Sequence, residues 1–258
     1  NWVCPEIFYG KLNYERYLSQ LTLVKNANLN FLRCWGGAVI NKESFFELCD
    51  ELGIMVWQEF PLACNRYEGT DSYISVLKEE AAAIIDNIKE HVCLMLWCGG
   101  NELFNNWSCM TEQDRAIRLM DKLTFEKTPE IPFLPTSPVM GMAHGPYNFN
   151  MVDGSEVIGV IQKSRNTGYT EFGGGGFSTK ETLLRIGDMS ELEPLDLNNE
   201  IATEHGTHAL ALQIERYFGK ITDTDKLIEC GQFMQTVVQQ FIFEEARRQK
   251  PYCSIVSN

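Results

Sequence analysis

Short apolar segments alternate with amphipathic segments along the chain, and this alternation limits the fold more than any other feature. The clearest apolar segments are residues 28–35, 54–57 and 92–97. Residues 45–52 and 74–88 lie between them and carry apolar side chains three or four positions apart, as an amphipathic helix requires. Strands that alternate with helices form parallel sheets, so the sequence predicts an α/β fold.

The number of repeats indicates which α/β fold to expect. A partial strand at residues 1–5, a closing strand at 252–256 and the segments between them give eight strand positions that alternate with helices. This is the pattern of a (β/α)8 TIM barrel. We expect one barrel domain over residues 1–258, truncated at both ends. A doubly wound sheet is the alternative, but the glycine run 173–176 matches neither a G-x-G-x-x-G motif nor a P-loop.

Several residues are typical of helix ends. Asn13 and Asn41 are expected to cap two helices at their amino ends, and Gly53 to end the second. Thr111 and Asp114 resemble a capping pair for the helix that follows them. The other expected elements are strands at 133–135, 139–143 and 167–173, and helices at 156–163, 204–218 and 222–248.

The charge of the chain narrows the class of partner. The formal net charge is −13 at pH 7, and a basic surface is what nucleic acids and anionic membranes attract. We therefore expect neither of these partners, and a neutral substrate fits better. The sequence also contains no apolar run of the length that crosses a membrane.

Cysteine and histidine spacing gives little support for a metal centre. The nine cysteines show no C-x-x-C pair, and several lie in apolar segments, so we expect mostly free, packed thiols. His205 and His208 form an H-x-x-H pair without a neighbouring cysteine or third ligand. We interpret this pair as a surface or helix-packing feature rather than as a metal site.

Two glutamates follow apolar strands and are the strongest candidates for chemistry. Glu102 follows the strand at 92–97 after two glycines, and Glu171 follows Tyr169 and Thr170. In a barrel, catalytic residues lie at the carboxyl ends of the strands. Glycoside cleavage needs two carboxyl groups, one to protonate the leaving oxygen and one to attack the anomeric carbon.

Around both glutamates the sequence resembles glycoside hydrolase family 2, in its β-mannosidase-like branch. Glu102 stands in Leu-Trp-Cys-Gly-Gly-Asn-Glu, and Glu171 in Tyr-Thr-Glu-Phe-Gly. The resemblance spans nearly the whole chain. Supporting matches are Asn1-Trp2 with Pro5 and Phe8, Leu32-Arg33-Cys34-Trp35-Gly36-Gly37, the segment from Gly53 to Phe60, and His91.

The resemblance implies a retaining β-glycosidase that acts on terminal sugars and needs no cofactor or metal. By this likeness Glu171 is the nucleophile and Glu102 the acid/base, with their carboxyl groups roughly 5 to 5.5 Å apart. The substrate would be a carbohydrate. The family also places β-sandwich domains in front of the barrel, so we expect such domains in the parent protein.

Further site residues follow from the same resemblance. Arg33 would donate a charge-assisted hydrogen bond that keeps Glu171 ionised. Asn101 would bind the sugar hydroxyl beside the reacting carbon. Glu59 would bind sugar hydroxyls, and Trp35 and Trp107 would stack on the sugar ring.

The sequence departs from the mannosidase pattern at two places. The family motif Gly-Asn-Asn-Glu reads Gly-Gly-Asn-Glu here, with Gly100 at the second position, and Trp-His-Gly is replaced by Ala143-His144-Gly145. The wall that the tryptophan would form is missing, while His144 and Tyr147 are still expected to line the site. The uronate-reading Asn-x-Lys motif of β-glucuronidases occurs only at 87–89, on a predicted helix, which argues against an acidic sugar.

Three other readings stay open at this point. The altered motif at 143–145 allows a carbohydrate-binding barrel that has lost turnover. Another family 2 specificity, such as β-galactosidase, is equally compatible with the two glutamates. A metal-dependent barrel hydrolase would need His144, His205 and His208 to meet at one ion.

Overall fold

The computed structural model of the protein describes residues 1–195, 198–204 and 208–258. The chain forms two compact units, Asn1–Met142 with Ser257 and Ala143–Val256 with Asn258. The prediction of one catalytic domain over residues 1–258 stays a prediction. Among the described helices, none combines the length and apolarity needed to cross a lipid bilayer.

The first unit alternates helices and strands as the sequence predicts. Its elements are the 3-10 turn Tyr9–Lys11, α1 (Tyr14–Asn26), β1 (Phe31–Cys34), α2 (Glu43–Leu52), β2 (Met55–Glu59), α3 (Asp71–Ile88), β3 (Leu94–Cys98), α4 (Arg115–Lys127) and β4 (Phe133–Leu134). The strands form one sheet in the order β1-β2-β3-β4, and every pair is parallel. Trp2 adds a parallel bridge to Cys34 at the outer edge of β1, where the sequence predicts a partial first strand.

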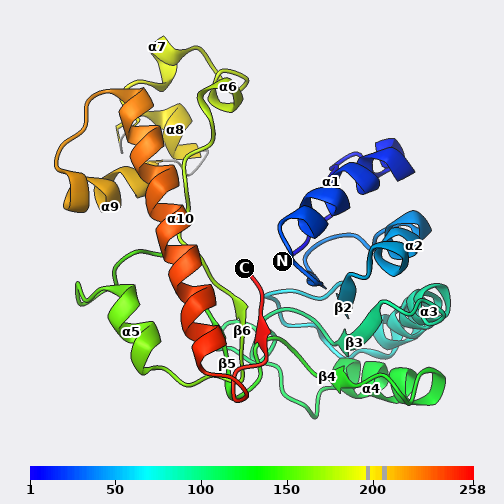
Figure 1. Cartoon of the computed structure of the whole chain (residues 1–258). Coiled ribbons are helices and arrows are strands. Elements are labelled where there is room, and N and C mark those ends of the chain that lie inside the picture. The colour runs from blue at the N-terminus through cyan, green and yellow to red at the C-terminus, as the bar shows by residue number, and fades with distance from the viewer. Residues whose placement is uncertain (196–197, 205–207) are drawn as a thin grey trace. The chain divides into compact units, whose positions relative to one another are not determined.

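The strand order of this sheet is sequential, and Figure 1 shows α1 to α4 side by side along it. A doubly wound sheet would reverse its strand order and carry helices on both faces. The sequential order of the four-stranded sheet is therefore consistent with the barrel pattern. In the described part of the chain the ladders form two separate sheets and do not close into a ring.

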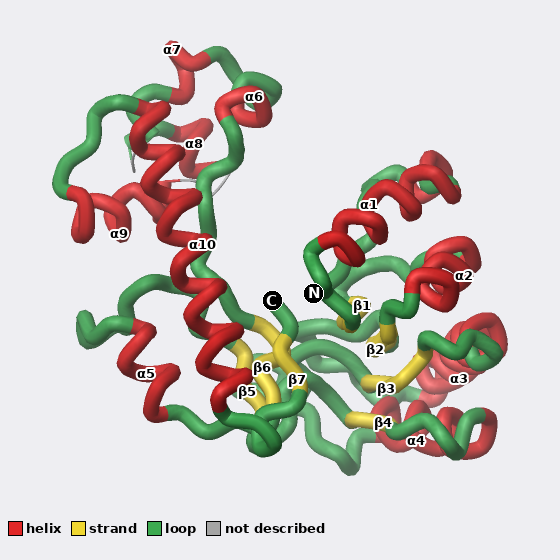
Figure 2. Tube along the Cα trace, viewed as in Figure 1, coloured by secondary structure: helices red, strands yellow, loops and turns green. Residues whose placement is uncertain are grey.

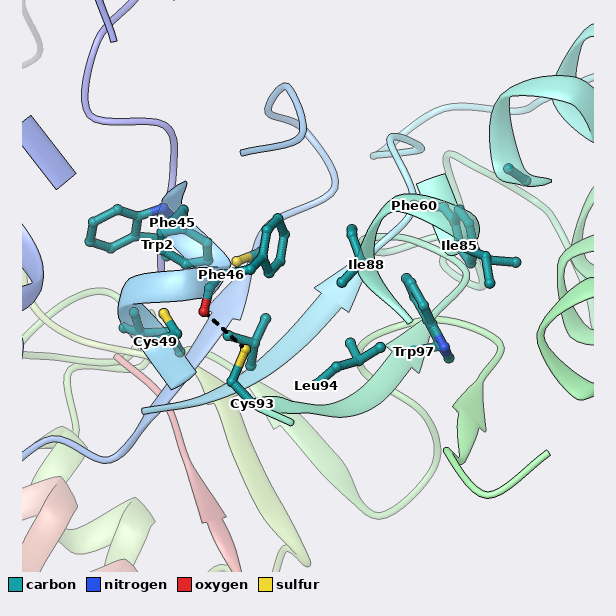
Figure 3. Packing of buried hydrophobic residues seen from close by; sticks show 14 of the residues in the cluster. Trp2, Phe45, Phe46, Cys49, Phe60, Ile85, Ile88, Cys93, Leu94 and Trp97 are labelled. Carbon is teal, nitrogen blue, oxygen red and sulfur yellow. Dashed lines mark hydrogen bonds between the residues drawn. The ribbon is translucent and has the colours of Figure 1, made fainter. Parts of the chain in front are cut away.

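A continuous apolar core joins this sheet to its helices. Phe46 of α2, Ile88 of α3 and Trp97 of β3 are each buried to 1% exposure or less, and Figure 3 shows their packing, with the Cys93 thiol donating to the Phe46 carbonyl oxygen at 3.7 Å. Burying a large apolar side chain contributes roughly 1.5–3 kcal/mol. This core therefore fixes the sheet edge from which the candidate site residues project.

The helix ends show which capping residues could be predicted from neighbouring residues in the sequence. Asn13 accepts a hydrogen bond from the Arg16 amide, and Gly53 ends α2 with a φ of 68°, so both predictions are confirmed. Asn41 was predicted to cap α2, but Lys42 holds that position and the Asn41 side chain is buried. Its Oδ1 accepts from the Trp2 indole nitrogen at 3.1 Å. A partner distant in sequence thus replaces the local capping bond.

The third strand differs in detail from its prediction. It starts at Leu94, two residues later than expected, and Met95 within it is 47% exposed. An unbroken apolar run indicates a strand that is buried on both faces; this holds for Leu94 and for Leu96 to Cys98 but not for Met95. Asp114 stands at the amino end of α4, and its carboxylate accepts from the Thr111 amide at 2.6 Å.

In its described residues the second unit carries three strands and several helices, drawn as ribbons in Figure 1 and by element type in Figure 2. Its elements are β5 (Met142–His144), α5 (Val157–Lys163), β6 (Gly168–Glu171), α6 (Lys180–Leu183), α7 (Met189–Leu192), α8 (Glu200–Glu204), α9 (His208–Phe218), α10 (Thr224–Arg248) and β7 (Ile255–Val256). The sheet order is β5-β6-β7, with β6 and β7 parallel. The long helix α10 packs against α5 and α9, and its buried stripe includes Met234, Val238 and Ile242.

Candidate active site

Glu102 is presented by a strained turn at the end of β3. Gly100 has a φ of 149°, and a Cβ built there would lie 2.3 Å from the Leu62 carbonyl oxygen. Glu102 itself has a φ of 51°, in the left-handed region that non-glycine residues seldom adopt. Its amide donates to the Ser137 carbonyl at 2.8 Å, and its carbonyl accepts from the Ser108 hydroxyl. Such strain is typical of functional sites.

A fully buried ion pair lies beside this turn. Arg33 Nε donates to Glu59 Oε1 at 2.7 Å, and neither side chain is exposed. The other Glu59 oxygen accepts from the Gly36 amide at 2.7 Å. Glu59 was predicted to bind sugar hydroxyls. Its carboxylate is buried and accepts from Arg33 and from the Gly36 amide, and its contact with a sugar stays a prediction.

Arg33 also orients the side chain of Asn101. Its Nη2 donates to Asn101 Oδ1 at 2.6 Å, and its Nη1 donates to Asn1 Oδ1 at 2.8 Å. The guanidinium therefore fixes which way the Asn101 amide faces, with its Nδ2 directed toward Cys64. The predicted contact of Arg33 with Glu171 would join the two units and stays a prediction.

The sequence reasoning missed Cys64, which touches both residues of the Asn-Glu pair. Asn101 Nδ2 donates to Cys64 Sγ at 3.2 Å, and the thiol donates to Glu102 Oε2 at 3.5 Å. A signal was present in the sequence, because Cys64 follows Glu59 by five residues in the loop after a predicted strand. Asn1, the partner of Arg33, was also missed as a site residue.

The two tryptophans predicted as stacking walls differ in their surroundings. Trp35 is half-buried, and its ring covers Gly37, where a Cβ would lie 2.1 Å from the ring. Trp107 is 64% exposed in the loop after Glu102. Both have ring surface that is not fully covered, and their contact with a sugar stays a prediction.

In the second unit, Glu171 ends β6 and is held by two side chains. The Tyr147 hydroxyl donates to Glu171 Oε2 at 2.7 Å. His144 Nδ1 lies 3.5 Å from the same oxygen, with the His144 side chain 6% and the Glu171 side chain 20% exposed. A carboxylate with hydrogen-bond donors on one oxygen is oriented for nucleophilic attack by the other.

Backbone bonds bring the loop after β5 to the end of β6. The Gly145 amide donates to the Glu171 carbonyl at 2.8 Å, and the Gly173 amide donates to the Pro146 carbonyl at 2.9 Å. These two bonds bracket Glu171 and place Tyr147 next to its carboxylate. The segment from which the family's tryptophan is missing thus still delivers two polar side chains to Glu171.

Two buried thiols, Cys34 and Cys98, interact electrostatically with the Glu59 carboxylate. Burial, and secondarily the Glu59 carboxylate, raises the pKa of the Cys98 thiol well above its usual range. Burial likewise raises the pKa of the Cys34 thiol, with the neighbouring Cys93 and Glu59 adding to the effect. These thiols stay neutral at physiological pH. Among the described residues no cysteine forms a disulfide bond, in agreement with the prediction of mostly free thiols.

The structure thus groups the predicted site residues in two sets. Arg33, Glu59 and Asn101 connect to Glu102 in the first unit, and His144 and Tyr147 contact Glu171 in the second. Of the alternative histidine set, His205 lies outside the described residues, and so does the side chain of His208. The roles of all these residues stay predictions.

Known β-mannosidases are similar to this chain over part of their own length. No family model matches the chain. The β-mannosidase of Mus musculus is 27% identical over 260 aligned residues, covering 88% of this chain and 29% of the relative. That of Capra hircus is 36% identical over 102 residues, covering 40% of this chain and 12% of the relative. The chain spans less than a third of the length of these curated relatives.

Two solved structures share the fold. A β-D-mannosidase from Dictyoglomus thermophilum superposes with a TM-score of 0.85 at 24% identity, covering 100% of this chain and 34% of that chain. An exo-chitosanase from Amycolatopsis orientalis gives a TM-score of 0.71 at 18% identity, covering 96% of this chain and 32% of that chain.

Proposed function

We propose that this chain, a β-mannosidase-like domain of glycoside hydrolase family 2, forms the catalytic part of a retaining β-glycosidase. The observation that carries the proposal is the placement of Glu102 after β3 and Glu171 at the end of β6, each with a hydrogen-bond donor on its carboxylate. Two glutamates at strand ends, each oriented by its own partners, are what a double displacement on a glycoside requires.

The proposed reaction has two steps. In the first, one Glu171 oxygen attacks the anomeric carbon while Glu102 gives its proton to the leaving oxygen, which forms a glycosyl ester on Glu171. In the second, Glu102 takes a proton from water, which attacks the anomeric carbon and releases the sugar and the Glu171 carboxylate. No cofactor takes part. The proposal requires the two carboxyl groups to lie roughly 5 to 5.5 Å apart in the working enzyme.

The hydrogen bonds around Glu171 and Asn101 each have a role in the proposed reaction. Tyr147, which donates to one Glu171 oxygen, would keep the other oxygen directed at the sugar. Arg33 orients the Asn101 amide, and Asn101 would bind the hydroxyl beside the anomeric carbon. A hydrogen bond to that hydroxyl stabilises the transition state more than the bound sugar.

We further propose a terminal β-D-mannoside as substrate and a (β/α)8 barrel as the setting. The curated relatives named above carry the name β-mannosidase, and the sequential parallel sheet of the first unit agrees with an arc of such a barrel. The chain covers less than a third of those relatives, so further domains, β-sandwiches among them, would complete the parent protein.

The deciding experiment is the trapping of the glycosyl ester. Incubation of the full-length protein with a 2-deoxy-2-fluoro-β-mannosyl fluoride should stop turnover and add the mass of the fluorosugar to the peptide that contains Glu171. The Glu171→Gln variant should neither turn over aryl β-glycosides nor be labelled, while Glu112→Gln, an exposed glutamate in the first unit, should behave as wild type. Normal turnover by Glu171→Gln would exclude this mechanism.

A panel of 4-nitrophenyl β-glycosides would separate the other readings. Faster release from the β-galactoside than from the β-mannoside would indicate another family 2 specificity. Binding of a β-mannoside without turnover or labelling would indicate a carbohydrate-binding barrel that has lost its activity. Loss of turnover in a chelator would favour the metal-dependent reading instead.

A further inference from the structure

Two left-handed residues meet at the end of the first sheet. Cys64 has a φ of 48° and Glu102 a φ of 51°, a conformation that costs free energy for residues other than glycine. The two residues come from different loops, after β2 and after β3. Strain of this kind persists where the surrounding structure imposes it, and both residues here belong to one hydrogen-bonded group.

Backbone bonds hold these loops against each other. The Cys64 amide donates to the Asn101 carbonyl at 3.0 Å, and the Asn101 amide donates to the Leu62 carbonyl at 2.9 Å. Ala63 and Asn101 form a parallel bridge. Main-chain hydrogen bonds therefore set the position of Cys64 relative to Glu102.

The side chains form a directed series that ends at Glu102. Buried Glu59 fixes Arg33, Arg33 donates to Asn101, and Asn101 donates to the Cys64 sulfur. The thiol that accepts from Asn101 donates its own hydrogen to Glu102 Oε2 at 3.5 Å. Neighbouring hydrogen bonds polarise one another, so the series gives the thiol a preferred direction.

We propose that Cys64 is a positioning residue that holds the Glu102 carboxyl group for proton transfer to the leaving group. This proposal rests on the proposed function, because it assumes that Glu102 is the acid/base. Cys64 acts through Glu102 and contacts no reacting atom. Without the thiol, the Glu102 side chain would populate other rotamers, and fewer encounters would place its proton at the glycosidic oxygen.

A pair of substrates tests the proposal in the full-length protein. Phenyl β-mannoside releases a basic oxygen that needs protonation, whereas 2,4-dinitrophenyl β-mannoside releases an anion that does not. Cys64→Ala should lower kcat/KM for the phenyl substrate by about threefold to tenfold, the effect of one modest hydrogen bond. The value for the dinitrophenyl substrate should change by less than about twofold. Cys64→Ser, which keeps a donor, should restore much of the loss.

Cys109 provides the matched control. It is an exposed cysteine in the same left-handed region, with a φ of 54°, and its thiol donates to the Asn106 carbonyl instead of to Glu102. Cys109→Ala should leave both kcat/KM values unchanged. An equal loss on both substrates in Cys64→Ala would show a general structural effect and overturn the proposal, as would no loss on either.

A second measurement needs no turnover, so it separates this proposal from the proposed function. A carboxylate beside a thiol disfavours the thiolate, and in a Cys109→Ala background Cys64 is the exposed thiol described in the structure. Adding Glu102→Gln should speed the reaction of Cys64 with Ellman's reagent several-fold. An unchanged rate would show that the thiol and the carboxylate do not interact in solution, whatever the enzyme hydrolyses.

Discussion

Arg33 and Glu59 form an ion pair with 2.7 Å between Nε and Oε1 and with no exposed surface on either side chain. Removing one partner of a buried pair leaves the other charge without compensation, which is costlier than the pair itself is favourable. The pair also affects the candidate active site, because Arg33 orients the Asn101 side chain. A change in Glu59 should therefore affect both folding and the Asn101 amide.

Glu59→Gln should lower the free energy of unfolding by about 3 kcal/mol, because it keeps the shape of the side chain and removes its charge beside buried Arg33. Urea denaturation measures this. Asp71→Asn is the control, since its partner Arg115 and Asp71 itself are 56% and 94% exposed. That substitution should cost less than about 1 kcal/mol. Similar losses of unfolding free energy in Glu59→Gln and Asp71→Asn would contradict the expected cost of disrupting the buried ion pair.

Tyr147→Phe should reduce kcat/KM for aryl β-mannosides by about tenfold, because it removes a hydrogen bond to the charged Glu171 carboxylate. The donor distance is 2.7 Å in the native protein. Tyr217→Phe removes a hydroxyl that accepts from Asn150 at 2.8 Å and should leave kcat/KM unchanged. Steady-state kinetics measures both variants. Equal kcat/KM values for Tyr147→Phe and Tyr217→Phe would refute the role of Tyr147.

Gly100→Ala should destabilise the protein by more than about 2 kcal/mol. Its φ is 149°, and a Cβ would lie 2.3 Å from the Leu62 carbonyl oxygen. Gly159→Ala makes the same chemical change inside α5, where a Cβ meets nothing within 4 Å. It should be stabilising by about 0.5–1 kcal/mol. Thermal unfolding of both variants measures the contrast, and a tolerated alanine at position 100 would disprove the packing argument.

The free energy of unfolding should fall as the pH rises above about 9, the ordinary value for a thiol. Burial raises the pKa of the Cys34, Cys49, Cys93 and Cys98 thiols above 9.0 in the folded protein. The folded chain then keeps protons that the unfolded chain releases, so alkaline pH favours unfolding. Below pH 9 this contribution is fully present.

Urea denaturation between pH 7 and 10 in a reductant measures the alkaline effect. Cys98→Ala should give a shallower decline with pH than wild type, whatever its stability at pH 7. Cys109→Ala, which removes an exposed thiol, should keep the wild-type decline. Identical slopes in all three proteins would show that the buried thiols do not carry the pH dependence.

The order and type of the elements could be predicted because they depend on neighbours in the chain. Apolar residues at period 3.6 or in short runs mark α2, β2 and α3, and Asn13 and Gly53 act within a few residues of their own positions. The two glutamates could be found for the same reason. Glu102 lies in the turn after β3, and Glu171 is the last residue of β6.

Long-range partners could not be predicted in this way. Asn41 looks like a cap, yet it accepts from Trp2, 39 positions away. Glu59 stands at a strand end in the sequence, and only the structure shows that it is buried against Arg33, 26 positions away. Cys64 carried no motif at all, and its role depends on Asn101 and Glu102, which reach it from another loop.

The sequence by itself determined that this protein alternates strands and helices and carries a glutamate at or shortly after the end of two of its strands, because hydrophobic periodicity and glycine placement are local properties. Only the tertiary structure decided which side chains order those glutamates. Buried polar groups must find hydrogen-bond partners, and in a parallel sheet the partners come from neighbouring strand ends that are far apart in the chain. Cys64 is therefore the hydrogen-bond donor to Glu102, and Tyr147 is a hydrogen-bond donor to Glu171.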